Sequence, residues 1–272
     1  IVSGGNYNTV VGDEAGTAIT TGDSNTAVGY AALDANTTGS NNTATGDNAL
    51  TANTTANNNT ANGYQALAAN ITGENNVAVG LQALTSNTSS SNTAVGTQSL
   101  AANTSGSNNV ATGYHALNAN TTGISNTAVG KDSLKANTTG ESSVAVGESA
   151  LLSNTTGNYN VAVGRVTLDA NTTGAYNTGL GYGALSANTT ANYNTALGSL
   201  ALASNTTGAD NVAIGMNTLD SNTTGANNTA VGGGALQANT TASNNVATGY
   251  HALFTNTTGT YNTASGYHAL KA

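Results

Sequence analysis

A unit of 17 residues repeats along the 272-residue chain, and this period constrains the fold more than any other feature of the sequence. We call the residue before each short strand-like segment position 1. Copies then start at residues 8, 25, 42, 59, 76, 92, 109, 126, 143, 160, 177, 194, 211, 228, 245 and 262. The spacing is 17 residues, except for one interval of 16 between residues 76 and 92, where one residue is deleted after Asn87 in an expected turn. Such a period is typical of solenoids, in which stacked coils bury a face that one coil cannot bury alone.

The consensus of the repeat is N-T/V-A-V-G-x-x-A-L-x-A-N-T-T-G-x-N. Positions 2 to 4 are short and rich in β-branched residues, which predicts a strand, and position 5 is Gly in all sixteen copies. Position 9 is Leu in fifteen of the sixteen copies, so we expect one buried row of leucines. The sequence therefore predicts an all-β protein, a parallel β-solenoid (β-roll) of about sixteen 17-residue coils.

The two faces of the predicted strand differ in the residues they tolerate. Position 3 is Ala in fourteen copies, whereas position 4 changes from Val to Thr45, Asn62 or Ser265. An unpaired Asn in a dry core costs about 1–3 kcal/mol. Ala is therefore expected to face the interior, leaving positions 2 and 4 as an outer stripe. Positions 6, 7 and 10 accept many residue types and are expected to face solvent.

Composition excludes several classes of protein. Aromatic residues make up 4 % of the chain, and Trp, Pro and Cys are absent, so a globular core of large side chains and a disulfide scaffold are both excluded. The net charge of −8, without a basic stripe, argues against nucleic-acid binding. Since no apolar run approaches the roughly 20 residues of a membrane span, we expect no membrane insertion.

Residues 1–272 are expected to form a single repeat array. Ile1 and Ala272 both fall at position 11, so both ends interrupt a copy of the repeat. We expect the chain to be a window of a longer fibre protein.

The strand segments resemble those of a known family. "NNVAVG" at 75–80 and "DNVAIG" at 210–215 are similar to the strand motif of the left-handed β-roll in the heads of trimeric autotransporter adhesins. The whole repeat also resembles arrays in bacterial and phage tail-fibre proteins. The "ANTTG" segment makes each coil about three residues longer than the adhesin pattern. The resemblance implies an extracellular fibre or adhesin shaft.

The tripeptide Asn-x-Thr/Ser begins at position 12 of fourteen successive copies, and two interpretations stay open. Stacked Asn amides form hydrogen-bonded ladders along solenoids, and the same tripeptide is an N-glycosylation acceptor. Either way, we expect the Asn-Thr-Thr turns to form an outer row. The candidate residues are Asn36, Asn53, Asn70, Asn87, Asn103, Asn120, Asn137, Asn154, Asn171, Asn188, Asn205, Asn222, Asn239 and Asn256.

Other chemistry finds weak support in the sequence. Regular Thr rows suggest ice binding, but only residues 43–45 place Thr-x-Thr on one strand. Tyr159, Tyr176 and Tyr193 share position 17 and could form an aromatic rail for sugars, although turn packing explains them as well. His115, His251 and His268 all occupy position 7, and the last two lie in successive coils, close enough in principle to share a metal; no acidic row accompanies them, so we expect solvated surface histidines and predict no metal site. No repeated residues assemble an acid/base pair or a catalytic triad, so we expect no enzyme, no catalytic residues and no cofactor.

The sequence thus favours a structural protein at the cell or virion surface. We expect it to assemble with itself, as a homo-oligomer or a continuous filament, and covalent glycans are a possible further partner. Attachment to a host or surface, as in tail fibres and adhesins, and ice binding are the alternatives.

Overall fold

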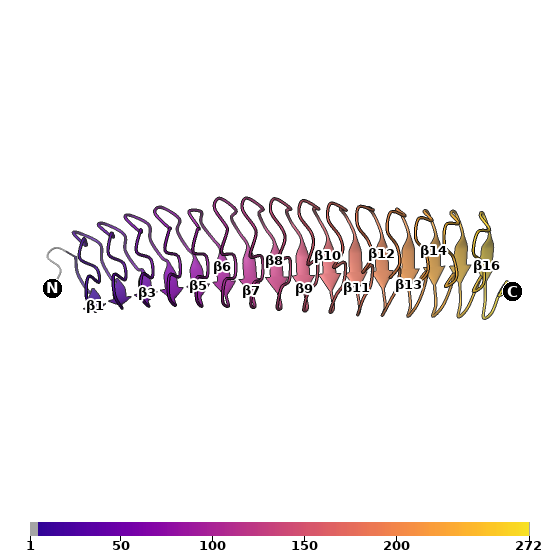
Figure 1. Ribbon diagram of the computed structural model, residues 1–272, viewed down its shortest axis with the longest axis horizontal. Coiled ribbons are helices and arrows are strands. Elements are labelled where there is room, and N and C mark those ends of the chain that lie inside the picture. Colours follow the sequence, from indigo (N-terminus) through magenta and orange to yellow (C-terminus); the bar gives the residue numbers. More distant parts are fainter. Residues whose placement is uncertain (1–4, 272) are drawn as a thin grey trace. The chain divides into compact units, whose positions relative to one another are not determined.

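The computed structural model describes residues 5–271, which form sixteen three-residue strands and no helix. Every strand occupies positions 2 to 4 of a repeat, one strand in each coil (Figure 1). The strands are β1 (Thr9–Val11), β2 (Thr26–Val28), β3 (Thr43–Thr45), β4 (Thr60–Asn62), β5 (Val77–Val79), β6 (Thr93–Val95), β7 (Val110–Thr112), β8 (Thr127–Val129), β9 (Val144–Val146), β10 (Val161–Val163), β11 (Thr178–Leu180), β12 (Thr195–Leu197), β13 (Val212–Ile214), β14 (Thr229–Val231), β15 (Val246–Thr248) and β16 (Thr263–Ser265). The chain is therefore an all-β parallel β-solenoid with about 17 residues in each turn, as the period predicts.

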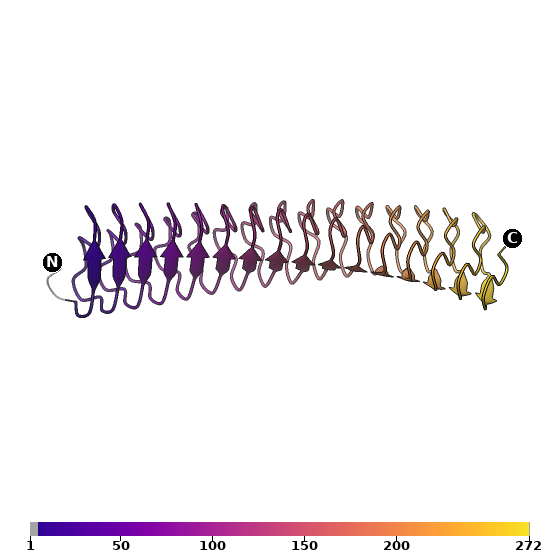
Figure 2. The ribbon, with the colours of Figure 1, turned by 90° about the horizontal axis from the view of Figure 1, so that it is seen from below.

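The chain divides into two units, Ile1–Thr139 with β1 to β8 and Gly140–Ala272 with β9 to β16. In each unit every strand pairs in parallel with the next strand along the chain (Figures 1 and 2). The register is one repeat, so that Thr26 pairs with Thr43 in the first unit and Val161 pairs with Thr178 in the second. Equivalent residues of successive coils therefore lie side by side within each unit.

Backbone hydrogen bonds between coils continue beyond the strands. The amide of Leu33 donates to the carbonyl of Ala49 at 3.0 Å, and the amide of Thr37 donates to the carbonyl of Thr54 at 2.8 Å. Turns and strands are thus both held to the next coil. Since these bonds require equivalent residues to face one another, an insertion or deletion is tolerated only where it leaves the other rows aligned.

The core consists of small side chains and one row of leucines. The Ala residues at position 3 are almost fully buried, and Leu117, Leu185 and Leu219 at position 9 are each 0 % exposed. The predicted Leu row is confirmed over most of its length. Leu270, in the last described coil, is 60 % exposed because no further coil covers it.

The outward direction of positions 2 and 4 is also confirmed. Asn62 and Thr112, at position 4, are exposed, while the Ala between positions 2 and 4 is buried in both strands. The expectation for the variable positions holds only in part. Position 6 is mostly exposed, whereas position 10 is half-buried in nearly every described coil and position 7 in most of them. Their side chains lie along those of the neighbouring coils, which shields part of their surface.

Left-handed backbone conformations recur at positions 7, 9 and 17, although these positions are seldom Gly. The buried leucines have φ near +50°, as at Leu117 (φ 51) and Leu219 (φ 52). A branched or bulky residue rarely adopts this conformation. Its repetition in every complete coil shows that burial of the Leu side chain and the bonds to the next coil outweigh the local backbone preference.

Candidate functional site

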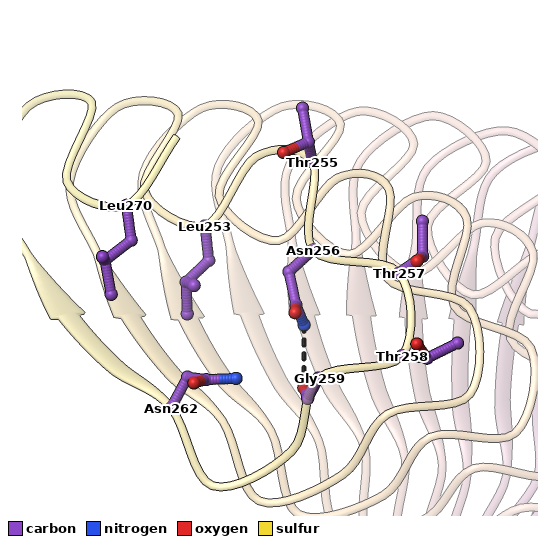
Figure 3. Close-up of a pocket in the computed structure, with 8 residues that line it drawn as sticks. All are labelled: Leu253, Thr255, Asn256, Thr257, Thr258, Gly259, Asn262 and Leu270. Carbon is purple, nitrogen blue, oxygen red and sulfur yellow. Dashed lines mark hydrogen bonds between the residues drawn. The ribbon is translucent and has the colours of Figure 1, made fainter. Parts of the chain in front are cut away.

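The position-12 asparagines form a buried ladder of side-chain amides in each unit. In the second unit Asn222 is 0 % exposed, and its Nδ2 donates to Oδ1 of Asn205 in the preceding coil at 2.9 Å. The same nitrogen donates to the carbonyl of Gly225 at 3.0 Å, and Oδ1 of Asn222 accepts from Nδ2 of Asn239 at 2.8 Å. In Figure 3 the equivalent Asn256 extends across its turn to Gly259. Each of these amides therefore closes its own turn and also connects two coils, but the ladder of the first unit is interrupted at Asn70, whose Oδ1 is buried without a hydrogen-bond partner.

A second row of amides, at position 1, converges on the same carbonyls. Asn211 Nδ2 donates to the carbonyl of Gly225 at 2.8 Å, and Asn211 Oδ1 accepts from the backbone amide of Asn228 at 3.0 Å. The position-15 carbonyl thus receives one donor from each Asn row, which satisfies both of its lone pairs inside the coil. This arrangement explains why positions 1 and 12 hold Asn almost without exception.

This geometry supports the ladder interpretation of the Asn-x-Thr/Ser tripeptide. Asn36, Asn120 and Asn188 are each 0 % exposed, and Nδ2, the atom to which an N-linked sugar attaches, donates into the fold. The expectation that the Asn forms part of the outer row is wrong, because the amide is paired inside the coil. A sugar on Nδ2 would replace these bonds. N-glycosylation of the fourteen residues remains a prediction for mass measurement on native protein.

The two threonines that follow each Asn have different surroundings. In most described coils the position-13 hydroxyl donates to the carbonyl of the equivalent residue in the next coil, as Thr223 does to Thr240 at 3.0 Å. The position-14 residue is exposed throughout, and in the described coils its hydroxyl makes no hydrogen bond within the fold, as at Thr173 and Thr224. In most pairs, therefore, only the second Thr presents a free hydroxyl on the outer row.

The 16-residue copy differs from the others at position 14. Nδ2 of Asn76 donates to the carbonyl of Ser89 at 2.8 Å, where the preceding coil has Asn59 donating to the carbonyl of Gly73 at 2.9 Å. Ser89 therefore takes the place of position 15, and the deleted residue is the exposed Thr of position 14. The Ser89 hydroxyl turns inward and donates to Oδ1 of Asn87 at 3.0 Å. The hydrogen bond to Asn87 therefore explains the Ser of this Asn-x-Ser tripeptide without reference to glycosylation.

The outer face of the strands is uncharged and partly apolar. All sixteen residues at position 2 are Thr or Val, and position 4 carries Val, Leu, Ile, Thr, Ser or Asn. Val161, Leu180 and Ile214 are 36 %, 49 % and 37 % exposed. In each unit these side chains form two rows in register along the strands. Charged groups are confined to other positions of the repeat.

The position-17 tyrosines stack on one another in the second unit. The ring centroids of Tyr159 and Tyr176 are 5.0 Å apart, and those of Tyr176 and Tyr193 are 5.2 Å apart, with interplanar angles of 16° and 13°. Tyr176 has a neighbouring ring against each face, and Tyr159 and Tyr193 each have one, so four of the six ring faces in the row are covered by another ring. This arrangement does not favour the sugar rail considered from the sequence, which needs free ring faces.

Position 7 contributes a chain of polar side chains that the sequence analysis did not identify. In the first unit Gln82 Nε2 donates to Gln65 Oε1 at 3.0 Å, and Gln98 Nε2 donates to Gln82 Oε1 at 2.9 Å. His115 Nε2 lies 2.8 Å from Gln98 Oε1, and Nδ1 of the same ring is 3.5 Å from Oδ1 of Asp132. The signal in the sequence was three successive Gln at one position. These contacts explain the half-burial of position 7 in these coils and give His115 a structural role.

The remaining titratable groups of residues 5–271 include a pair of stacked histidines and a partly enclosed carboxylate. Among residues 5–271, no three His, Cys, Asp or Glu side chains lie where they could hold a metal ion. His251 and His268 stack with ring centroids 5.5 Å apart. Burial, followed by the charges of Lys271 and His251, lowers the pKa of His268. Burial also raises the pKa of Asp169, whose Oδ1 is enclosed without a hydrogen-bond partner.

Two hollows lie at the terminal coils of the described chain. One, of about 380 Å³, is bordered by Leu253, Leu270 and Asn256 (Figure 3), and the other, of about 590 Å³, is bordered by Tyr7 and Val10. Each opens on the face of a coil that has a neighbour on one side only. Each hollow therefore corresponds to the space that an adjacent coil occupies at the other coils.

Comparison with protein-family models and with curated protein sequences finds no match. None of the described residues forms a helix long and apolar enough to cross a membrane.

Proposed function

We propose that this chain is a structural protein, a stretch of an extracellular fibre that assembles with further copies of itself through the outer face of its strands. One observation carries the proposal. None of the residues at positions 2 and 4 is charged, although the chain contains twelve acidic and four basic residues. A chain with a net charge of −8 that keeps one face free of charge has a surface suited to a second copy of the same face.

The exposed side chains of this face provide the driving force. Leu180 is 49 % exposed and Ile214 is 37 % exposed, and burial of apolar surface contributes roughly 25 cal/mol per Å². β-Branched and aliphatic side chains in regular rows interdigitate when two sheets pack face to face at about 10 Å. A long repeat multiplies a small gain per coil, so that many copies of a weak contact together give a stable assembly.

The internal bonding of the coils supports the fibre interpretation. Asn ladders and backbone hydrogen bonds connect successive coils inside each unit, as at Asn205 and Asn222. Such connections suit a protein that resists extension and bending. The resemblance of the strand motif to adhesin heads and tail-fibre arrays supports an extracellular location and makes surface attachment the second role to test.

The proposal is tested with two matched double variants. Leu180→Lys with Ile214→Lys adds two charges to the outer face, and Tyr182→Lys with Met216→Lys adds two charges to position 6 of the same two coils. Light scattering should show wild-type protein and the position-6 variant as multimers, and the face variant at the 26.5 kDa of one chain. A monomeric wild type, or a face variant that assembles like the wild type, would refute assembly through this face.

A further inference from the structure

The tyrosine row at position 17 of the second unit has a geometry suited to covalent chemistry. Tyr159, Tyr176 and Tyr193 are 49 %, 50 % and 56 % exposed, and they lie in three successive coils. Ser142 and Asp210 occupy the same position in the coils on either side, so the row contains three rings. Among the described residues, none of the three phenol hydroxyls makes a hydrogen bond within the fold. The hydroxyls and the ring edges are therefore accessible to reagents in solution.

The backbone holds these rings in register. Position 17 adopts the left-handed conformation in each coil, with φ of 56° at Tyr159, 58° at Tyr176 and 61° at Tyr193. The amide of Tyr176 donates to the carbonyl of Asn158 at 3.1 Å, and the amide of Tyr193 donates to the carbonyl of Ala175 at 3.2 Å. Since the three side chains leave equivalent backbone positions in the same direction, corresponding ring atoms lie next to one another.

We propose that this row is a site of oxidative coupling, at which a one-electron oxidant joins the tyrosines of adjacent coils as dityrosine. Each phenol loses one electron and its hydroxyl proton to give a phenoxyl radical. The two radicals form a carbon–carbon bond between ring positions ortho to the oxygens, and the hydrogens on those carbons move to the oxygens and restore both phenols. With peroxide as the terminal oxidant and a haem peroxidase as the catalyst, two tyrosines and one hydrogen peroxide give one dityrosine and two waters.

The separation of the rings favours this reaction between neighbours. A radical on Tyr176 has a second phenol at 5.0 Å on one side and at 5.2 Å on the other. Reactants held next to each other in one molecule react as if at very high concentration. Because each ring is about half exposed, it can tilt until the ortho carbons meet. Tyr159 and Tyr193 are two coils apart, about 9.6 Å at the spacing of strands, and do not couple directly.

The link would fasten one coil to the next. It joins residues 17 positions apart in the sequence and closes a loop that contains one complete coil. A covalent cross-link that closes a loop stabilises a fold mainly by restricting the unfolded chain. The row would thus provide a covalent fastening for a chain without cysteine. The inference is independent of the proposed assembly, because the reaction takes place within one molecule.

The test is treatment of the purified protein, at high dilution, with horseradish peroxidase and hydrogen peroxide. We expect dityrosine fluorescence, the loss of two hydrogen atoms per link, and a cross-linked peptide pair that joins Tyr176 to Tyr159 or to Tyr193. Peptide mapping separates this link from one between Tyr250 and Tyr267, which stack at 5.6 Å.

Two variants and a control decide the result. Tyr176→Phe keeps the stacked ring and should abolish every link within the row, as should the double variant Tyr159→Phe with Tyr193→Phe. Tyr182→Phe is the control, because Tyr182 is also 50 % exposed but its neighbours at position 6 are Arg165 and Ser199. The control should leave the yield unchanged. Absence of a row-derived peptide pair in the wild type, or equal yields in Tyr176→Phe and wild type, would overturn the proposal.

Discussion

Replacing Asn222 by alanine should destabilise the second unit far more than replacing its exposed neighbour Thr224. Asn222 is fully buried, and its amide makes three hydrogen bonds, at 2.8 to 3.0 Å, with Asn205, Gly225 and Asn239. The Gly225 carbonyl keeps its bond from Asn211 at 2.8 Å, so that loss is partly compensated. Asn222→Ala also removes the donor to Oδ1 of Asn205 and the acceptor for one N–H of Asn239.

The magnitude follows from those two atoms. A buried polar atom deprived of its partner costs about 1–3 kcal/mol, so the two together cost about 2–6 kcal/mol. Thr224→Ala removes an exposed side chain whose hydroxyl bonds to nothing in the described fold, and its effect should stay within about 0.5 kcal/mol. Thr223→Val removes the bond from Thr223 to Thr240 and should cost about 1 kcal/mol.

The assay is guanidinium unfolding followed by circular dichroism, combined with hydrogen exchange of the backbone amides. Exchange is needed because the stability of a repeat array is local, a sum of the energies of coils and of the contacts between neighbours. Asn222→Ala should accelerate exchange in its own and the two adjacent coils. If Asn222→Ala and Thr224→Ala unfold alike and protect the same amides, the ladder contributes no stability, and the constancy of Asn at position 12 requires another cause.

Four further outcomes are expected. Leu185→Ala should lower the free energy of unfolding by about 2–5 kcal/mol in the same denaturation assay, because Leu185 is fully buried. Gly181→Ala should lower the melting temperature sharply, since φ is +130° and an added Cβ would lie 2.6 Å from the backbone of Gly198; an unchanged melting temperature would contradict this conformation. Burial raises the pKa of Asp169 in the fold, so its stabilising contribution is complete below its unfolded pKa of about 3.9 and is lost as pH rises through the folded pKa. Asp169→Asn should therefore be more stable than the wild type at about pH 7, with the difference disappearing near pH 3 in pH-dependent denaturation. Intact mass of native protein should equal the mass of the sequence if the ladder alone explains position 12, and excess mass that peptide-N-glycosidase removes would show N-linked glycans instead.

Much of the architecture follows from the sequence alone. The period of 17 determines that coils stack, and the column of leucines identifies the buried row that Leu117 and Leu219 confirm. At position 4 one copy has Asn62 where the consensus residue is Val. Because an unpaired amide is costly in a dry core, this residue was enough to predict that position 4 faces outward and that the Ala at position 3 faces inward. These predictions succeeded because each depends only on which residue types occur at one position of the repeat. The sixteen copies provide sixteen observations of that position.

Only the tertiary structure showed the roles of the polar residues at positions 12, 13 and 14 of the repeat. A tripeptide such as Asn222-Thr223-Thr224 has the same letters whether its amide faces a glycan or a neighbouring coil. Only the stacking of equivalent coils supplies the buried Oδ1 and carbonyl acceptors that draw Asn222 inward and leave Thr224 outside. The same applies to Ser89, which aligns with the exposed Thr in the sequence yet occupies position 15 in space. Hydrogen bonds between coils join residues 17 apart, and a linear pattern records that such residues are alike without recording which atoms meet.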